Sequence, residues 1–227
     1  MDSHLLEIAP LDDHNLMLLA KVRPRGWTNP EPARRYNLVV VGAGTAGLVS
    51  AVGAAGLGAK VAIIERDLMG GDCLNFGCVP SKALIASART IARVRGANEF
   101  GIEVPLGARA DFAQAAARMR EIRASIAHND SAERLRNLGI DVYLGAGKFV
   151  ANDAVEVDGK RLTFRRAAIA TGARAAVPPI PGLAETGYLT NETVFSMTEL
   201  PARLAIIGGG PIGCELAQAL IRLGAEV

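Results

Sequence analysis

The chain has 227 residues, of which 50% are hydrophobic, 4% are aromatic and 25 residues are glycine. This composition is typical of an α/β protein with close helix–strand contacts, and it excludes a disordered chain and a disulfide-rich scaffold. The formal net charge of +2 gives no reason to expect binding to nucleic acid or to a membrane surface. No apolar run approaches the ~20 residues of a membrane helix. We find no signal-peptide pattern and expect a cytoplasmic, reducing setting, in which a cysteine pair is more often catalytic than structural.

Residues 1–35 are predicted to form an N-terminal extension. Asp12 and Asp13 precede apolar residues at helical spacing, which predicts a short helix capped by an aspartate. The three prolines within residues 23–32 then predict an irregular arm, which Trp27 would anchor on the surface. We expect this segment to contribute packing rather than function.

The pattern of a dinucleotide-binding fold begins after the extension. Residues 37–41 are a continuous apolar run of the kind found in buried parallel strands, and the motif Gly42-Ala43-Gly44-Thr45-Ala46-Gly47 follows at once. An alanine-rich helix to about residue 57 and a strand over residues 61–64, which ends at Glu65, complete the unit. Strand, GxGxxG, helix, strand and acid in this order are the full context of a dinucleotide site.

The glycines have separate roles in that interpretation. Gly42 permits the tight turn, Gly44 lets a pyrophosphate reach the backbone N–H groups, and Gly47 lets the helix approach the strand. The helix N-terminus would stabilise the phosphates, and Glu65 would hold a ribose hydroxyl pair.

Residues 70–82 contain two cysteines in the sequence Gly-Gly-Asp-Cys-Leu-Asn-Phe-Gly-Cys-Val-Pro-Ser-Lys. Cys73 and Cys78 are five positions apart, so a disulfide between them requires a distorted first helical turn, which Gly77 permits. A thiol near a helix N-terminus has a lowered pKa. Lys82 follows Cys78 by one helical turn and projects from the same face. We interpret the segment as a redox dithiol beside a group that handles electrons.

Three other interpretations of the cysteines carry less weight. A zinc site needs further ligands at short spacing, whereas the chain offers only Cys214 and three histidines without ligand spacing, so no metal site is predicted. A structural disulfide is uncommon in a reducing compartment. Two unrelated core cysteines stay an alternative, although they would not explain the neighbouring glycines and lysine.

The middle of the chain alternates helical and strand patterns. We expect a helix from Pro80 to about Arg95 and then a loop through Gly101 and Gly107. A second helix follows, with a core stripe of Phe112, Met119, Ile122 and Ile126, and a third helix ends before Gly139. A strand over residues 140–144 comes next and is followed by Gly145-Ala146-Gly147. Next come a hairpin of residues 154–157 and 161–164 around Asp158-Gly159, and another strand over residues 167–170 that ends at Thr171-Gly172.

The first pattern returns near the end of the chain. The proline-rich residues 178–182 are the candidate domain boundary, and residues 204–207 are predicted to be a strand. A second GxGxxG, Gly208-Gly209-Gly210-Pro211-Ile212-Gly213, and a helix to about residue 223 follow. One strand and one helix cannot close a nucleotide-binding sheet, so we expect the front part of a longer protein. The predicted domains are an extension (1–35), a nucleotide-binding domain with the dithiol (36–180), and a linker with the beginning of a second such domain (181–227).

The order of these motifs resembles the pyridine nucleotide–disulfide oxidoreductases, which include glutathione reductase, dihydrolipoamide dehydrogenase and mercuric reductase. The resemblance covers residues 36–227, and the cysteine segment matches the family pattern except at Phe76. Its Gly-Gly-Asp-Cys-Leu-Asn portion is most similar to mercuric-reductase-like proteins. The resemblance implies a Rossmann-like FAD-binding domain, with a parallel sheet, helices and a small β-meander, followed by the start of a Rossmann-like NAD(P)-binding domain.

The resemblance also implies roles for individual residues. Cys78 would be the thiol beside the flavin and Cys73 the thiol that exchanges with substrate. Lys82 would be a cation near the flavin, paired with Glu215 because a buried lysine needs a carboxylate, and Cys214 would be a small core residue. The implied cofactor-binding residues are Gly42, Gly44, Thr45, Ala46 and Gly47, then Glu65, Arg66, Gly71, Asp72, Gly77, Gly147, Ala170, Thr171, Gly172 and Asn191, and in the second motif Gly208, Gly210 and Gly213.

The implied activity is an electron relay. Electrons pass from NAD(P)H through FAD to the Cys73–Cys78 disulfide, and then to a small-molecule disulfide or mercuric ion. The family's dimerisation domain and acid/base pair would follow residue 227, so a homodimer is implied for the complete protein and this portion alone would be inactive. Two residues depart from the family: Asp72 replaces the usual threonine, and Pro211 replaces a tyrosine found in some members. The choice between NAD and NADP is not encoded in these residues.

Other functions stay open at this point. Dihydrolipoamide dehydrogenase shares the motifs. A truncated, non-catalytic flavin- or nucleotide-binding module would fail to oxidise NADPH with any of these substrates. A metal-buffering thiol protein would bind zinc or mercury without flavin, but the surrounding flavin-binding motifs argue against it.

Overall fold

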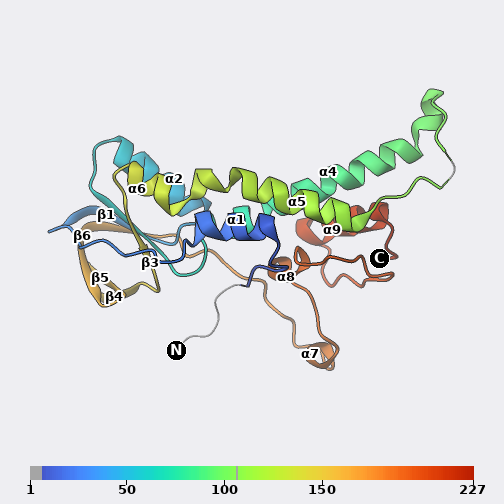
Figure 1. Ribbon diagram of the computed structural model, residues 1–227. Coiled ribbons are helices and arrows are strands. Elements are labelled where there is room, and N and C mark those ends of the chain that lie inside the picture. The colour runs from blue at the N-terminus through green and yellow to red at the C-terminus, as the bar shows by residue number, and fades with distance from the viewer. Residues whose placement is uncertain (1–6, 106) are drawn as a thin grey trace.

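The computed structural model describes residues 7–105 and 107–227, in which helices lie along one side of a six-stranded sheet and extend beyond it (Figure 1). The strands are β1 (Tyr36–Val41), β2 (Val61–Glu65), β3 (Asp141–Leu144), β4 (Lys148–Ala151), β5 (Ala154–Val157) and β6 (Lys160–Ile169). The α-helices are α1 (Asp13–Val22), α2 (Thr45–Gly56), α3 (Gly71–Asn75), α4 (Cys78–Arg95), α5 (Phe112–Ile126), α6 (Ala132–Asn137), α7 (Leu183–Thr186), α8 (Asn191–Val194) and α9 (Pro211–Leu223). The short 3-10 helices η1 (Ala97–Phe100) and η2 (Ala127–Asp130) follow α4 and α5.

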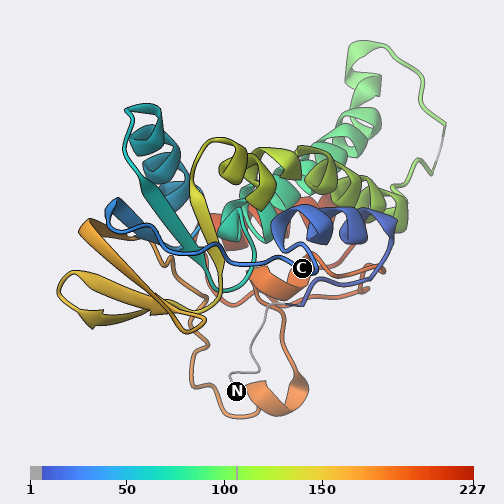
Figure 2. The same ribbon diagram turned by 60° about the vertical axis from the view of Figure 1, so that its left-hand side comes forward.

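The sheet has the strand order β3-β2-β1-β6-β5-β4. β3, β2, β1 and the second half of β6 run parallel, whereas β4, β5 and the first half of β6 form an antiparallel meander (Figure 2). The predicted fold class is therefore confirmed: a parallel sheet with helices and a small β-meander. The Asp158-Gly159 hairpin is confirmed as well, and both residues have the positive φ that such a two-residue turn requires.

Both faces of the parallel part of the sheet are buried. Val40 and Ile63 pack against residues of α1, α2 and α6 on one face. Val39 and Ile64 belong to a separate cluster with the side chains of the meander on the other face. Because successive strand residues point to opposite faces, burial on both sides requires the continuous apolar runs seen in the sequence.

A second group of helices extends away from the sheet (Figure 1). α4 packs against α5 and α9, and the core between them contains Leu84, Met119 and Leu220. The expected core stripe of α5 is confirmed at Phe112 and Met119. It is wrong at Ile126, which lies at the helix end and is 36% exposed.

The N-terminal extension forms the expected capped helix. The side chain of Asp12 accepts a hydrogen bond from the backbone N–H of Asn15 at 2.9 Å, which makes Asp12 the N-cap of α1. The Trp27 Nε1 group donates to the Val142 carbonyl at 3.2 Å, so the predicted anchor exists. The division into residues 1–35, 36–180 and 181–227 stays a prediction.

Several expected boundaries are wrong. Residues 167–170 do not form a strand of their own, because β6 runs without interruption from its pairing with β5 to its pairing with β1. Residues 204–207 form no strand; the chain there makes only an isolated bridge between Arg203 and Glu226 in the part that the structure describes. The α4 helix begins at Cys78 rather than Pro80, since a proline in the first turn needs no hydrogen-bonded N–H. The short elements α3 and β4 were not expected at all.

We predict that Gly47→Ala destabilises the protein, because a Cβ at Gly47 would lie 1.9 Å from the carbonyl oxygen of Gly42. The free energy of unfolding should fall by about 2–3 kcal/mol, as for other forced contacts in a packed interior. Gly53→Ala is the matched control, because Gly53 lies in the same helix and an added Cβ would have no atom within 4 Å. It should stabilise α2 by up to about 1 kcal/mol. Urea unfolding curves measure both variants, and equal stabilities would contradict the prediction.

Candidate functional site

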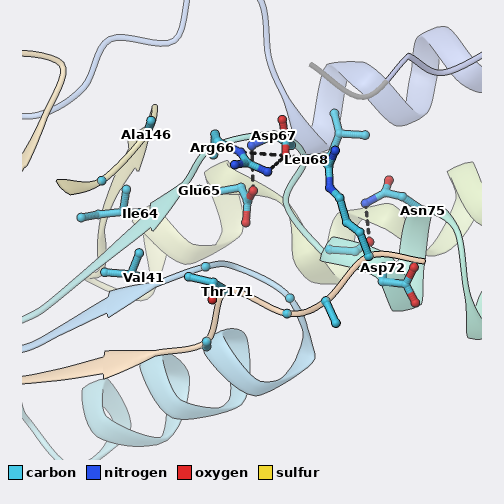
Figure 3. A pocket seen from close by; sticks show the side chains of 18 of the residues that line it. Val41, Ile64, Glu65, Arg66, Asp67, Leu68, Asp72, Asn75, Ala146 and Thr171 are labelled. Atoms are coloured by element: carbon cyan, nitrogen blue, oxygen red, sulfur yellow. Dashed lines mark hydrogen bonds and ion pairs between the residues drawn. The ribbon is translucent and has the colours of Figure 1, made fainter. Parts of the chain in front are cut away.

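A pocket of about 290 Å³ lies at the carboxyl ends of β1, β2, β3 and β6, where ligands bind in parallel α/β sheets. Its walls are the glycine motif after β1, the loop after β2, α3, the Gly145–Gly147 turn and the segment after β6. Figure 3 shows Glu65 and Arg66 on one side of the pocket and Asp72 and Asn75 on the other. The predicted site residues that line it are Gly42, Gly44, Glu65, Arg66, Gly71, Asp72, Gly147, Ala170, Thr171 and Gly172.

Glycine is required where the backbone segments around this pocket meet. Gly42 has φ +104°, and a Cβ there would lie 2.2 Å from the carbonyl oxygen of Ala170. Gly71 has φ +55°, and its Cβ would lie 2.6 Å from the Cα of Gly44. The pocket is therefore walled partly by bare backbone, which a pyrophosphate can approach closely.

Glu65 is a buried carboxylate held by two backbone N–H groups. Its Oε2 accepts from Ala43 and its Oε1 accepts from Asp67, both at 2.7 Å. Burial raises the pKa of Glu65 above its usual value, and the two backbone hydrogen bonds oppose that rise. Each oxygen keeps a lone pair for a further donor, such as a ribose hydroxyl.

A chain of charges that the sequence did not predict crosses one wall of the pocket. The Asp67 Oδ2 accepts from Arg66 Nε and from Arg174 Nη2, each at 3.1 Å, and Arg174 Nε lies 3.3 Å from Glu192 Oε1. The buried Asp67 Oδ1 has no hydrogen-bond partner among the described residues. Asp67 and Arg174 follow closely after the ends of β2 and β6, so the rule that ligands bind at carboxyl strand ends could have found them.

The cysteine pair lies next to this pocket on two separate helices. Cys73 is in α3 and Cys78 is the first residue of α4, with Gly77 between them. A Cβ at Gly77 would lie 2.6 Å from Asp72 Oδ2 and 3.0 Å from the Asp72 carbonyl oxygen, so the close packing between the cysteines favours glycine. Both cysteines are free thiols, Cys73 partly buried and Cys78 exposed.

Cys73 lies in the middle of the short helix α3, close to the Cys78 thiol. Burial raises the pKa of Cys73, and the hydrogen bond and charge of the neighbouring Cys78 thiol raise it further. The Thr45 hydroxyl acts in the opposite direction.

Lys82 and Glu215 form the ion pair that the resemblance implied. Their side chains join α4 to α9 and are 58% and 48% exposed. The expectation that the lysine is buried is therefore wrong, because this face of the two helices is open. Cys214 is exposed rather than in the core, and its thiol donates to the Gly209 carbonyl at 3.4 Å.

The remaining predicted cofactor residues lie outside the pocket itself: Thr45, Ala46, Gly47, Gly77, Asn191, Gly208, Gly210 and Gly213. Asn191 is nevertheless close, since its Nδ2 donates to Asp72 Oδ1 at 2.7 Å. A Cβ at Gly213 would lie 2.3 Å from the carbonyl oxygen of Gly208. The second motif thus repeats the close approach of turn and helix that Gly47 permits in the first.

Neither a metal centre nor a membrane span is found in the described part of the chain. Within residues 7–105 and 107–227, no group of His, Cys, Asp and Glu side chains has the arrangement to hold a metal ion. None of the helices in these two ranges combines the length and the apolar character that crossing a membrane would require.

Comparison with known proteins decides the family. The family model for pyridine nucleotide-disulphide oxidoreductases matches residues 36–227. The chain belongs to this family. Its matched part contains both glycine motifs, the cysteine pair, and all strands and helices after α1.

Relatives with two different activities have similar sequence identity to this chain. The chain is 36% identical over 192 residues to a mercuric reductase of Staphylococcus aureus, covering 85% of this chain and 35% of that protein. It is 34% identical over 199 residues to a dihydrolipoyl dehydrogenase of Acholeplasma laidlawii, covering 86% and 59%. The solved structure of the HOCl-induced flavoprotein disulfide reductase RclA of Escherichia coli has a TM-score of 0.68 and 32% identity, covering 84% of this chain and 40% of that chain. The chain therefore spans about a third to three fifths of the length of these proteins.

We predict that Cys73 titrates at a higher pH in the folded, reduced protein than in the unfolded protein, because burial and the Cys78 thiol disfavour its thiolate. The thiolate is the form that reacts with iodoacetamide, so the pH at which Cys73 alkylation reaches half its maximal rate should be higher in the folded state. Mass spectrometry of the separate Cys73 peptide measures this rate. The same protein in urea is the control. A folded-state midpoint at or below the unfolded one would contradict the prediction.

Proposed function

We propose that the protein is a FAD-dependent oxidoreductase that passes electrons from NAD(P)H to a Cys73–Cys78 disulfide, and from there to a small-molecule disulfide or to mercuric ion. The observation that carries this proposal is the position of α3. This helix contributes Gly71 and Asp72 to the pocket wall and Cys73 directly after them. The position of the cysteine pair beside the pocket with the glycine motif supports this proposal.

The residues of the pocket fit FAD. Gly42 and Gly71 contribute bare backbone to the pocket wall, and a Cβ at either would collide with the backbone of Ala170 or Gly44. Gly44 caps α2 without a side chain, so the first N–H groups of α2 have no competing side-chain cap and are available to a pyrophosphate. Glu65, at the end of β2, offers its remaining lone pairs to an adenosine ribose.

Bound FAD would supply hydride acceptance and electron transfer to the disulfide. Cys78, at the start of α4, would be the thiol beside the flavin, and Cys73 would exchange with the substrate. Lys82 would stabilise negative charge near Cys78, and Glu215 would hold the lysine in place. Gly208, Gly210 and Gly213, at the N-terminus of α9, would bind the pyrophosphate of NAD(P)H.

Mercuric ion is the substrate that we propose first, because the Gly-Gly-Asp-Cys-Leu-Asn segment is most similar to mercuric-reductase-like proteins. Dihydrolipoamide dehydrogenase is the second candidate, and the 39% identity over 198 residues to the dihydrolipoyl dehydrogenase of Chlamydia trachomatis favours it. For the complete protein we propose a cytoplasmic homodimer.

We predict that the purified full-length protein is yellow and gains a long-wavelength absorbance band when treated with a stoichiometric dithiol. The band would arise from charge transfer from the Cys78 thiolate to bound flavin, so it should be lost in Cys78→Ser. Cys73→Ser is the matched control, since it leaves Cys78 as a free thiol and should show the band without added dithiol. A full-length protein that stays colourless in the presence of FAD would refute the flavin assignment.

The substrate is tested by NADH and NADPH oxidation with mercuric ion or with lipoamide as acceptor. Turnover that depends on mercuric ion and is lost in Cys73→Ser supports the first candidate, whereas turnover with lipoamide supports the second. Bound flavin without turnover on any disulfide or mercuric ion would instead indicate a non-catalytic flavin-binding module. Zinc or mercury bound without flavin would indicate a thiol protein that buffers metal.

A further inference from the structure

We propose that residues 12–29, which we call the N-terminal brace, position the walls of the FAD pocket, and that Arg23 is the positioning residue for Glu65. The brace lies before residue 36, where the match to the family model begins. This inference rests on the proposed FAD site. It replaces the expectation that the extension contributes packing alone.

The first contact of the brace is with the loop that follows Glu65. Arg23 Nη1 donates to the carbonyl oxygen of Arg66 at 2.6 Å and also to that of Asp67. One residue earlier, the Val22 carbonyl accepts from the backbone N–H of Met69 at 3.0 Å. Two consecutive brace residues, Val22 and Arg23, therefore form hydrogen bonds with the backbone of this loop.

Asp67 links Arg23 to Glu65, because its backbone forms hydrogen bonds with both side chains. The N–H of Asp67 donates to Glu65 Oε1 at 2.7 Å, while the carbonyl of Asp67 accepts from Arg23. Arg23 therefore fixes the backbone around the donor that orients the buried carboxylate. Hydrogen bonds from a charged group to a carbonyl are stronger than neutral ones, so Arg23 can hold the loop without apolar packing.

A second contact reaches α3, which carries Cys73. The Asn15 Oδ1 accepts from Arg123 Nη2 at 2.7 Å, and Arg123 Nη1 donates to the carbonyl of Asn75, at the end of α3, at 2.6 Å. Arg123 is 2% exposed and its Nε has no partner among the described residues. A buried guanidinium with so few partners depends on each one, which makes Asn15 important for this link.

A third contact lies at β3, the edge strand of the sheet. Asn29 pairs with the backbone of Leu144 as a strand would: its Nδ2 donates to the Leu144 carbonyl at 3.1 Å, and its Oδ1 accepts from the Leu144 N–H at 2.8 Å. Gly145–Gly147, which line the pocket, follow directly. Figure 2 shows the blue N-terminal segment passing close to β3. The brace therefore contacts two walls of the pocket directly, the loop after β2 and the end of β3, and reaches the third, α3, through Arg123.

The test is Arg23→Ala in the full-length protein, with two readouts. In the FAD-free protein, hydrogen exchange of residues 66–69 should become at least about tenfold faster, because two charge-assisted hydrogen bonds are lost. The Kd for FAD, measured by flavin fluorescence, should rise by about tenfold or more, while turnover at saturating FAD changes by less than about twofold. Arg23→Lys keeps a charged donor and should restore part of the affinity.

Arg25→Ala is the matched control. Arg25 is exposed and makes no side-chain hydrogen bond or ion pair in the part of the chain that the structure describes, so neither readout should change. Unchanged exchange at residues 66–69 together with a wild-type Kd in Arg23→Ala would overturn the brace. A wild-type protein that binds no FAD would instead refute the proposed function, while the exchange experiment still tests the contact. If Arg23→Ala does not fold, Asn29→Ala tests the brace at residues 144–147 by the same two measurements.

Discussion

Backbone segments at the end of β1 approach one another so closely that no side chain fits at Gly42 or Gly47. A Cβ at either residue would meet a carbonyl oxygen at 2.2 Å or less, from Ala170 in one case and from Gly42 in the other. This approach turns the chain from β1 into α2 and places the N-terminus of α2 beside the end of β6. The pocket exists because strand ends, helix N-terminus and bare backbone meet at this point.

The electrostatics of the pocket follow from that geometry. Glu65 is buried because it ends a central strand, and its charge is held by the N–H groups of Ala43 and Asp67 rather than by a cation. The cations of the site, Arg66 and Arg174, pair with Asp67 on the pocket wall. The carboxylate that would bind the ribose is thereby left without a competing side-chain partner among the described residues.

α4 connects the two glycine motifs of the chain. It begins at Cys78, beside the first pocket, and its Lys82 pairs with Glu215 in α9, the helix that follows the second GxGxxG. The apolar contacts among α4, α5 and α9 hold this arrangement. Cys78 is thus fixed relative to both glycine motifs, and Cys73 lies on the preceding helix, α3.

The sequence by itself determined the features that depend on near neighbours in the chain. These features are local, because each depends on the backbone conformation of a few adjacent residues. They are the apolar runs of β1 and β2, the glycines of the tight turns, the Asp158-Gly159 hairpin and the aspartate cap of α1. A family resemblance carried by these motifs added the Lys82–Glu215 pair. Only the tertiary structure decided that β6 is continuous, that Lys82 is exposed, that burial raises the pKa of Cys73, and that Arg174 and Arg23 hold the loop after β2. Asn29 and Leu144 are 115 residues apart, and a polar side chain in an irregular arm does not reveal such a partner, because its contact depends on how the whole chain folds.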